Sequence, residues 1–179
     1  MRFELIPFPS EPLPKVKITG EIERTDNQLS VRYRLRGDLE NIIIPAHSAS
    51  LSRKDELWKT TCFEILLAIK GQLQYWEFNM SPSGDWNVYH MDAYRRVGFR
   101  EETSIQQLQF EGLKGAGTFT LNAEVDLHPI LQAGQLLEVA ITAIIQTRDG
   151  NETYWALSHP ASSPDFHLRE GFVIELAPS

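Results

Sequence analysis

Hydrophobic and polar residues alternate along much of the chain, and a period of two predicts β-strands. The clearest case is residues 29–36, where every second side chain is apolar and three arginines fill the positions between them. A strand of this kind has one buried and one solvated face, as in an antiparallel sheet. The same reasoning predicts strands at residues 16–23, 62–69, 73–80, 86–93, 118–125, 136–147, 153–157 and 171–176.

Turn sequences separate these runs. Asp149-Gly150 lies between two apolar runs and predicts a tight hairpin, because glycine adopts the positive φ that such turns require. A further turn is predicted from Gly112 to Gly117. Residues 126–134 have an Asp that could cap a helix and a terminal Gly, but they span only about two helical turns, so we interpret them as a short connector. Residues 101–110 fit a helix or a strand equally well.

Many short strands with at most one or two short helical turns predict an all-β fold, an antiparallel β-sandwich or barrel. The 179 residues fit one domain, residues 1–179, and Pro7 to Pro14 predict an extended N-terminal arm. Seventeen basic against twenty-four acidic side chains give a net charge of −7, which argues against a nucleic-acid binder. The sequence has no run of eighteen apolar residues, no secretory signal pattern and one cysteine, Cys62, so we expect a cytoplasmic protein without a membrane span.

Three segments are rich in Trp, Tyr, His and Arg, namely residues 55–64, 75–96 and 154–167. In the second segment, alternation places Glu77 and Asn79 on one face of the predicted strand, in line with Tyr75. A carboxylate and an amide beside a tyrosine can form a polar strip that binds a ligand.

Glu64 lies between Phe63 and Ile65 in a strand that is apolar on both sides. A carboxylate in such a strand must find partners or become neutral. Arg95 or Arg96 could supply a bidentate partner. The side chains of Glu64, Tyr75 and Arg96 therefore form either a buried structural network or part of a ligand site.

Exposed aromatic rings beside hydrogen-bonding side chains suit sugar recognition, because a pyranose offers an apolar C–H face and a rim of hydroxyls. Trp58 and Trp86 lie beside predicted loops, where a ring could stack on a sugar or pack at the edge of the core. The candidate ligand-binding residues are Trp58, Glu77, Asn79, Trp86, Tyr94, Arg95 and His159.

Other chemistries have weaker support in the sequence. Met80 or Met91 with His159 could ligate haem, although a strand methionine is usually core filler, and we predict no cofactor. His159, Asp165 and His167 match no standard metal-ligand spacing, and we predict no metal. Glu64 and Glu77 are the one carboxylate pair that could hydrolyse a glycoside, but nothing in the sequence sets their separation, and we predict a protein without catalytic activity. A scaffold that recruits an unidentified protein partner through a sheet face remains open.

The three aromatic segments together resemble the DOMON-like domains related to carbohydrate-binding module family nine. The resemblance is to a bacterial branch, some members of which are associated with UDP-N-acetylenolpyruvoylglucosamine reductase. It implies a β-sandwich whose relatives bind sugars or haem. We therefore expect a non-catalytic module for a saccharide or related polyol, with a haem-binding domain and a protein-interaction scaffold as alternatives. The matching residues are 56–59, 62–64, Tyr75, 77–79, 81–86, Tyr89, 94–95, 156–160 and 164–167.

Overall fold

The computed structural model describes residues 1–48, 50–95 and 97–178. Within these residues the chain forms twelve strands and three short 3-10 helices, and no helix in this part of the chain is long and apolar enough to cross a membrane. The strands are β1 (Arg2–Pro7), β2 (Val16–Thr25), β3 (Gln28–Gly37), β4 (Cys62–Ile69), β5 (Tyr75–Met80), β6 (Trp86–Met91), β7 (Arg100–Glu101), β8 (Gln109–Gly115), β9 (Thr118–Asp126), β10 (Leu137–Gln146), β11 (Glu152–Ala156) and β12 (Ile174–Leu176). The 3-10 helices are η1 (Leu39–Asn41), η2 (Leu57–Lys59) and η3 (Arg169–Gly171).

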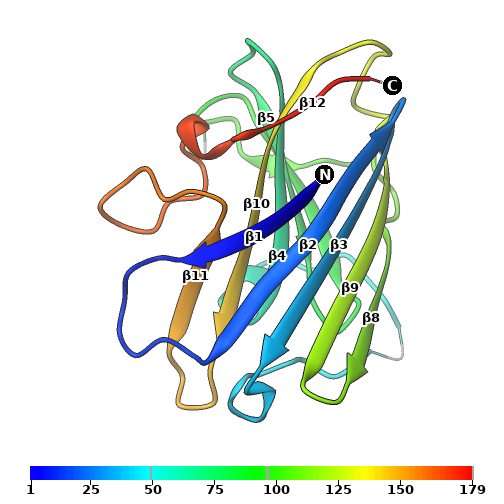
Figure 1. Ribbon diagram of the computed structural model, residues 1–179. Coiled ribbons are helices and arrows are strands. Elements are labelled where there is room, and N and C mark those ends of the chain that lie inside the picture. Colours follow the sequence, from blue (N-terminus) through cyan, green and yellow to red (C-terminus); the bar gives the residue numbers. More distant parts are fainter. Residues whose placement is uncertain (49, 96, 179) are drawn as a thin grey trace.

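The strands pair antiparallel and form the two layers of a β-sandwich. The first sheet has the order β1-β2-β3-β9-β8, and Figure 1 shows β2, β3, β9 and β8 side by side across the right of the view. The second sheet has the order β7-β6-β5-β4-β10-β11, with β12 paired to the start of β10. The single strand β1 joins the layers, because residues 2–5 pair with β2 while Ile6 and Pro7 pair with β11.

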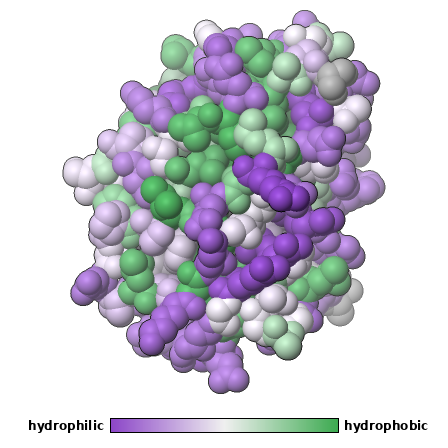
Figure 2. All heavy atoms as spheres, viewed as in Figure 1, coloured by the Kyte–Doolittle hydropathy of each residue, from purple (hydrophilic) through white to green (hydrophobic). Residues whose placement is uncertain are grey.

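The core lies between the two sheets and follows the period of two. In β3 the side chains of Leu29, Val31, Tyr33 and Leu35 are buried against the second sheet, and Arg32 points to solvent. Figure 2 shows hydrophilic side chains over the part of this face where β2 and β3 run in Figure 1. The first sheet therefore has the dry inner face and wet outer face that its sequence predicts.

The second sheet differs, because β4, β5 and β6 are buried on both faces. Their inner side chains join the main core, whereas Leu66, Tyr75 and Tyr89 point away from the first sheet and form a smaller apolar cluster. Phe172 and, less completely, Trp58 pack on this cluster from the loops. Loops therefore cover what we call the outer face of the second sheet, the face turned away from the first sheet.

Most of the predicted elements are confirmed. All nine predicted strands are present, with ends moved by a few residues, and the hairpin at Asp149-Gly150 joins β10 to β11. Residues 126–134 contain turns and no helix, as predicted for a short connector. The prediction of a turn throughout Gly112 to Gly117 is wrong, because β8 continues to Gly115. Strand β1 was not predicted, and the proposed arm from Pro7 begins at its last residue.

Candidate functional site

A pocket of about 420 Å³ opens on the outer face of the second sheet. This volume lies within the range of small-molecule sites. Four strands supply its floor, and three loops supply its walls. The floor residues are Glu64, Glu77, Ile144 and Tyr154, and the wall residues are Asp55, Glu56, Trp58, Arg95, Phe99, Pro164, Asp165, Phe166 and His167.

Two carboxylates occupy the middle of the floor. The strand register places Glu64 of β4 opposite Asn79 of β5 and Thr142 of β10, so all three share the outer face with Glu77. Asn79 donates its amide to Glu77 Oε1 at 2.8 Å, and Thr142 donates its hydroxyl to Glu64 Oε2 at 3.0 Å. Glu64 and Glu77 are only 2% and 7% exposed, so the sheet presents them to the pocket rather than to bulk water.

The surroundings of Glu64 disfavour its negative charge. Burial raises the pKa of Glu64 well above its ordinary value, the nearby charge of Glu77 raises it further, and the hydrogen bond from Thr142 opposes both effects. Among the described residues, no partner donates to Glu64 Oε1. Glu64 therefore has an oxygen free to interact with a ligand.

One wall of the pocket carries stacked aromatic rings. Trp58, on η2, makes an edge contact with Tyr89 of β6, and their ring centroids are 5.7 Å apart. Tyr89 stacks on Phe99 at 4.8 Å and donates its hydroxyl to Asp55 at 2.5 Å. Glu56, just before η2, has a left-handed backbone with φ of 59°, a conformation that non-glycine residues adopt only at some cost. The loop thus holds an uncommon conformation that places Trp58 at the pocket.

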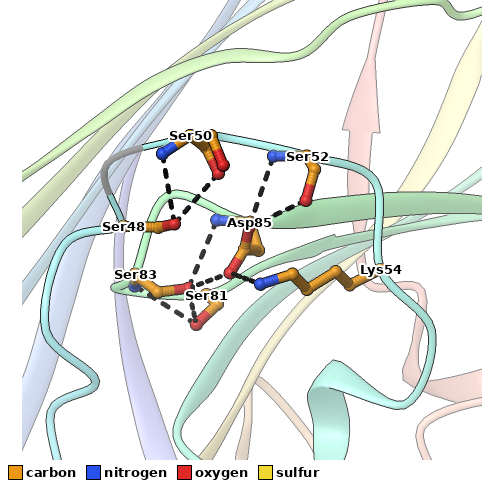
Figure 3. Close-up of polar contacts among 7 residues, drawn as sticks. All are labelled: Ser48, Ser50, Ser52, Lys54, Ser81, Ser83 and Asp85. Carbon is orange, nitrogen blue, oxygen red and sulfur yellow. Dashed lines mark hydrogen bonds and ion pairs between the residues drawn. The ribbon is translucent and has the colours of Figure 1, made fainter.

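A buried aspartate in the β5–β6 turn anchors the chain just before this wall. Asp85 is 4% exposed and accepts hydrogen bonds from Ser52 N, Ser52 Oγ, Ser83 Oγ and Lys54 Nζ at 2.8 to 3.3 Å, as Figure 3 shows. Burial alone would raise the pKa of Asp85, but the bonds from Lys54 and Ser83 lower it below its ordinary value. Asp85 therefore fixes the segment that leads directly into Asp55.

A second polar cluster joins the β6–β7 loop to the C-terminal loop. Asp165 Oδ2 accepts the hydroxyl of Tyr94 at 2.6 Å and lies 3.0 Å from Arg95 Nη2, while Asp165 Oδ1 accepts the backbone N–H of His167 at 3.0 Å. These bonds outweigh the effect of burial and lower the pKa of Asp165. His167 Nδ1 in turn lies 2.9 Å from the hydroxyl of Tyr75. We call Tyr94, Arg95 and Asp165 the latch, since they tie two walls of the pocket together.

The opposite side of the pocket carries Tyr154 of β11 and Phe166 of the C-terminal loop, whose rings meet edge to face at 6.1 Å. Because β6 and β11 lie on either side of β5, β4 and β10, aromatic rings flank the carboxylate floor on both sides. The arrangement offers apolar faces for stacking and fixed oxygen atoms between them.

No protein-family model and no curated protein sequence matches the chain. Solved structures do match it. A candidate carbohydrate-binding protein from Bacteroides uniformis aligns with 100% of this chain and 86% of its own length, with a TM-score of 0.73 and 12% identity. A family 9 carbohydrate-binding module from Caldicellulosiruptor kristjanssonii, solved with cellotriose, aligns with 89% of this chain and 74% of its own length, with a TM-score of 0.56 and 12% identity. The same kind of module solved with glucose aligns over 81% and 69%, with a TM-score of 0.51 and 12% identity.

The chain has a fold like that of family 9 carbohydrate-binding modules. The likeness confirms the predicted antiparallel β-sandwich. At 12% identity it shows the fold alone, and the chemistry of the pocket has to be argued from this chain's own residues.

The structure brings together most of the residues predicted to bind a ligand. Trp58, Glu77 and Arg95 line the pocket. Asn79 donates a hydrogen bond to Glu77, and Tyr94 belongs to the latch. Two members of the predicted structural network also belong to this region, because Glu64 lines the pocket and Tyr75 contacts His167. The third member, Arg96, lies outside the described residues.

Trp86 and His159 do not reach the pocket. Trp86 shares the inner face of β6 with Val88, is 6% exposed and packs in the core under the guanidinium of Arg53, which lies 4.4 Å from the ring centroid. His159 follows β11 and pairs through Nε2 with Ile6 O at 2.9 Å, on the strand that joins the sheets. Neither therefore contributes to the site described here.

The two methionines that could ligate haem lie on opposite faces of the second sheet. Met80 packs in the core between the sheets, whereas Met91 belongs to the cluster on the outer face of the second sheet. In the part of the chain that the structure describes, no three or more His, Cys, Asp or Glu side chains are grouped to hold a metal ion.

Sequence reasoning missed several pocket residues. Asp165, Phe166 and His167 lie in the third aromatic segment but are not among the predicted ligand-binding residues, and Phe99 lies in a loop without periodicity. Tyr154 carried a usable signal, because it alternates with the buried Trp155 in β11 and must therefore face outward.

Proposed function

We propose that the chain is a non-catalytic module that binds a saccharide or a related polyol in this pocket. The observation that carries the proposal is the floor of two nearly buried carboxylates, Glu64 and Glu77, flanked by aromatic rings on both sides. A pyranose ring can stack its C–H face on Trp58 or Phe166, and its hydroxyls can donate to the free carboxylate oxygens.

The latch adds a donor to these acceptors. Arg95 lines the pocket and has several N–H groups, only some of which Asp165 occupies. A sugar hydroxyl both donates and accepts, so a site with carboxylate acceptors and a guanidinium donor can satisfy both roles. The three similar structures described above, each presented as a carbohydrate-binding protein or module, support the same assignment.

The proposal is tested by calorimetric titration of the whole chain with a panel of mono- and oligosaccharides. We expect heats of binding for at least one sugar, with affinity lowered by about three- to tenfold in Trp58→Ala, the loss expected for one stacked ring. Phe8→Ala is the matched control, because it removes a partly buried ring that contacts His159 rather than the pocket. Heats no larger than dilution for the entire panel would overturn the proposal.

A second candidate has one specific observation in its favour. Glu64, with a raised pKa, and Glu77, its electrostatic neighbour, line one pocket, as the acid and its partner do in glycoside hydrolases. Incubation of the wild-type chain with any sugar that it binds, followed by product analysis, separates the two functions. We expect the oligosaccharide to be recovered intact, and hydrolysis that disappears in Glu64→Gln would establish the enzyme instead.

A further inference from the structure

The pocket has more acidic than basic side chains. Of its described lining residues, Asp55, Glu56, Glu64, Glu77 and Asp165 are acidic, whereas Arg95 carries a guanidinium and His167 an imidazole. This excess alone does not define a site, because neighbouring cations can neutralise carboxylates. The partners of each carboxylate decide how much negative charge a ligand would meet.

Among the residues that the structure describes, an arginine or lysine pairs with two of the five carboxylates. Arg95 pairs with Asp165, and Lys59 Nζ lies 2.6 Å from Glu56 Oε2. Asp55 receives only neutral donors, the hydroxyl of Tyr89 and the backbone N–H of Glu56. Asp55 therefore keeps its negative charge uncompensated at one side of the pocket.

The floor carboxylates have no arginine or lysine partner among the described residues. Glu64 receives the neutral hydroxyl of Thr142, and Glu77 receives the neutral amide of Asn79. His167 Nε2 lies 3.9 Å from Glu77 Oε2, beyond hydrogen-bond distance. Within the described chain, the side chain of Glu64 is almost fully buried and lines the cavity, yet Oε1 has no partner. Oε1 is not one of the fully buried atoms without a partner, so it is accessible from the cavity and can accept a hydrogen bond from a bound molecule.

A protonated amine fits this environment better than a neutral hydroxyl. An ammonium group donates three hydrogen bonds, and its positive charge can pair with the carboxylates of Glu64 and Glu77. The aromatic rings beside the floor, on Trp58 and Phe166, favour a cation as well, because the face of a ring is electronegative. Burial raises the pKa of Glu64, and the nearby charge of Glu77 raises it further, so a cation placed between the two carboxylates would favour their ionised forms.

We infer that the pocket selects amino sugars whose amine is free and protonated over the corresponding neutral or N-acetylated sugars. The inference rests on the proposed function, because it names the class of saccharide that the same pocket takes. The amine would lie between Glu64 and Glu77, and the sugar ring would contact the flanking aromatic side chains.

The test compares three ligands with one ring and different substituents at one position: glucosamine, N-acetylglucosamine and glucose. Each is titrated calorimetrically into the whole chain at about pH 7, where most of an aliphatic amine is protonated. We expect glucosamine to bind at least about tenfold more tightly than the two neutral sugars. Raising NaCl from about 0.05 to 0.5 M should weaken glucosamine binding and leave glucose binding unchanged, because salt screens only charged partners.

The variant Glu77→Gln keeps the shape of the floor and removes one charge. We expect it to reduce the preference for glucosamine over glucose by about tenfold, with a melting temperature close to that of the wild type. The control Glu124→Gln removes a carboxylate from the exposed face of β9 on the first sheet, and the preference should not change.

The outcomes separate the two claims. If neutral sugars bind as tightly as glucosamine, or if the preference survives in folded Glu77→Gln, the inference is wrong while the proposed saccharide-binding function stands. If none of the three sugars and no other saccharide of the panel binds, both are wrong.

Discussion

At the scale of single residues, Glu64 shows how the strand pattern and the loops together create an unusual carboxylate. Its strand is apolar on both sides, since Phe63 and Ile65 face the inner core and Leu66 belongs to the outer cluster. Burial and the charge of Glu77 raise its pKa well above the ordinary value of 4.5. The ionised form is therefore destabilised in the folded chain relative to the unfolded one.

This shift predicts a pH-dependent stability. Because the folded pKa is raised, the contribution of Glu64 is fully present below about pH 4.5 and is lost as pH rises through the folded pKa. The free energy of unfolding of the wild type should therefore fall relative to that of Glu64→Gln as pH rises from about 4 to 8. Urea denaturation at a series of pH values measures this difference. A difference that stays constant over the range, as we expect for the control Glu124→Gln, would contradict the account.

The sequence identified Glu64 as anomalous but could not decide between a structural and a ligand role. Its neighbours in the strand predict burial, whereas the walls of the pocket that Glu64 lines come from loops far away in the sequence. Trp58 and Trp86 show the same limit. Both lie beside loops. Trp86 points to the same inner face of β6 as Val88 and packs in the core, whereas Trp58 lies on η2 and packs on the outer face of the second sheet.

At the scale of elements, the alternation of side chains along the strands determines which residues form the floor of the pocket, and the loop before η2 forms one wall. Asp85 links the two, because it lies in the turn between β5 and β6 and accepts from Ser52 and Lys54. The backbone of the same segment pairs with Trp86, whose N–H donates to Ser52 O at 3.1 Å. The loop is therefore fixed to the sheet both by side-chain hydrogen bonds to Asp85 and by a backbone hydrogen bond from Trp86.

Replacing Asp85 should loosen this wall without unfolding the sandwich. We expect Asp85→Ala to lower the free energy of unfolding by about 1–3 kcal/mol, since several donors lose a nearly buried acceptor. Hydrogen exchange should quicken at the amides of Ser52 and Lys54, and the affinity for any bound sugar should fall. The control Asp149→Ala alters an exposed turn between β10 and β11 and should leave these amides unchanged. Unchanged protection at Ser52 in folded Asp85→Ala would refute the anchoring role.

Apart from the two-residue strand β7, two strands escaped prediction for physical reasons. In β8, glycine at positions 112 and 115 indicated a turn, but Gly112 is required where the ring of Phe119 approaches, and a Cβ there would lie 2.8 Å from Phe119 Cζ. Strand β1 changes partner from β2 to β11, and pairing with a strand about 150 residues later leaves no local pattern in Ile6 and Pro7. Local periodicity therefore predicted the strands whose partners share the same alternation and missed these two.

At the scale of the whole molecule, a hydrogen bond and ring contacts link the two sheets beneath the pocket. Tyr33 of the first sheet is fully buried and donates its hydroxyl to the backbone oxygen of Glu64 in the second sheet at 2.6 Å. Its ring also contacts Phe3 and Phe63, with centroids 5.7 and 5.0 Å away. The strand that carries the pocket carboxylate is thus tied directly to the opposite layer.

Removing this hydroxyl tests the link between the layers. We expect Tyr33→Phe to lower the free energy of unfolding by about 1–3 kcal/mol, because the buried carbonyl loses a donor while the ring contacts remain. Chemical denaturation measures the loss. Tyr154→Phe is the matched control, since its hydroxyl bonds Glu152 at the partly exposed surface and should contribute less. Equal losses in the two variants would argue against a special role for Tyr33.

The proposed binding function depends on one location, the outer face of the second sheet between Trp58 and Phe166. The most direct measurement is a crystal structure of the chain with the most tightly bound saccharide of the titration panel. We predict density for a sugar ring in contact with these aromatic side chains and within hydrogen-bond distance of Glu64 or Glu77. A sugar bound at the first sheet or at the edge of the sandwich, with this pocket unoccupied, would contradict the account.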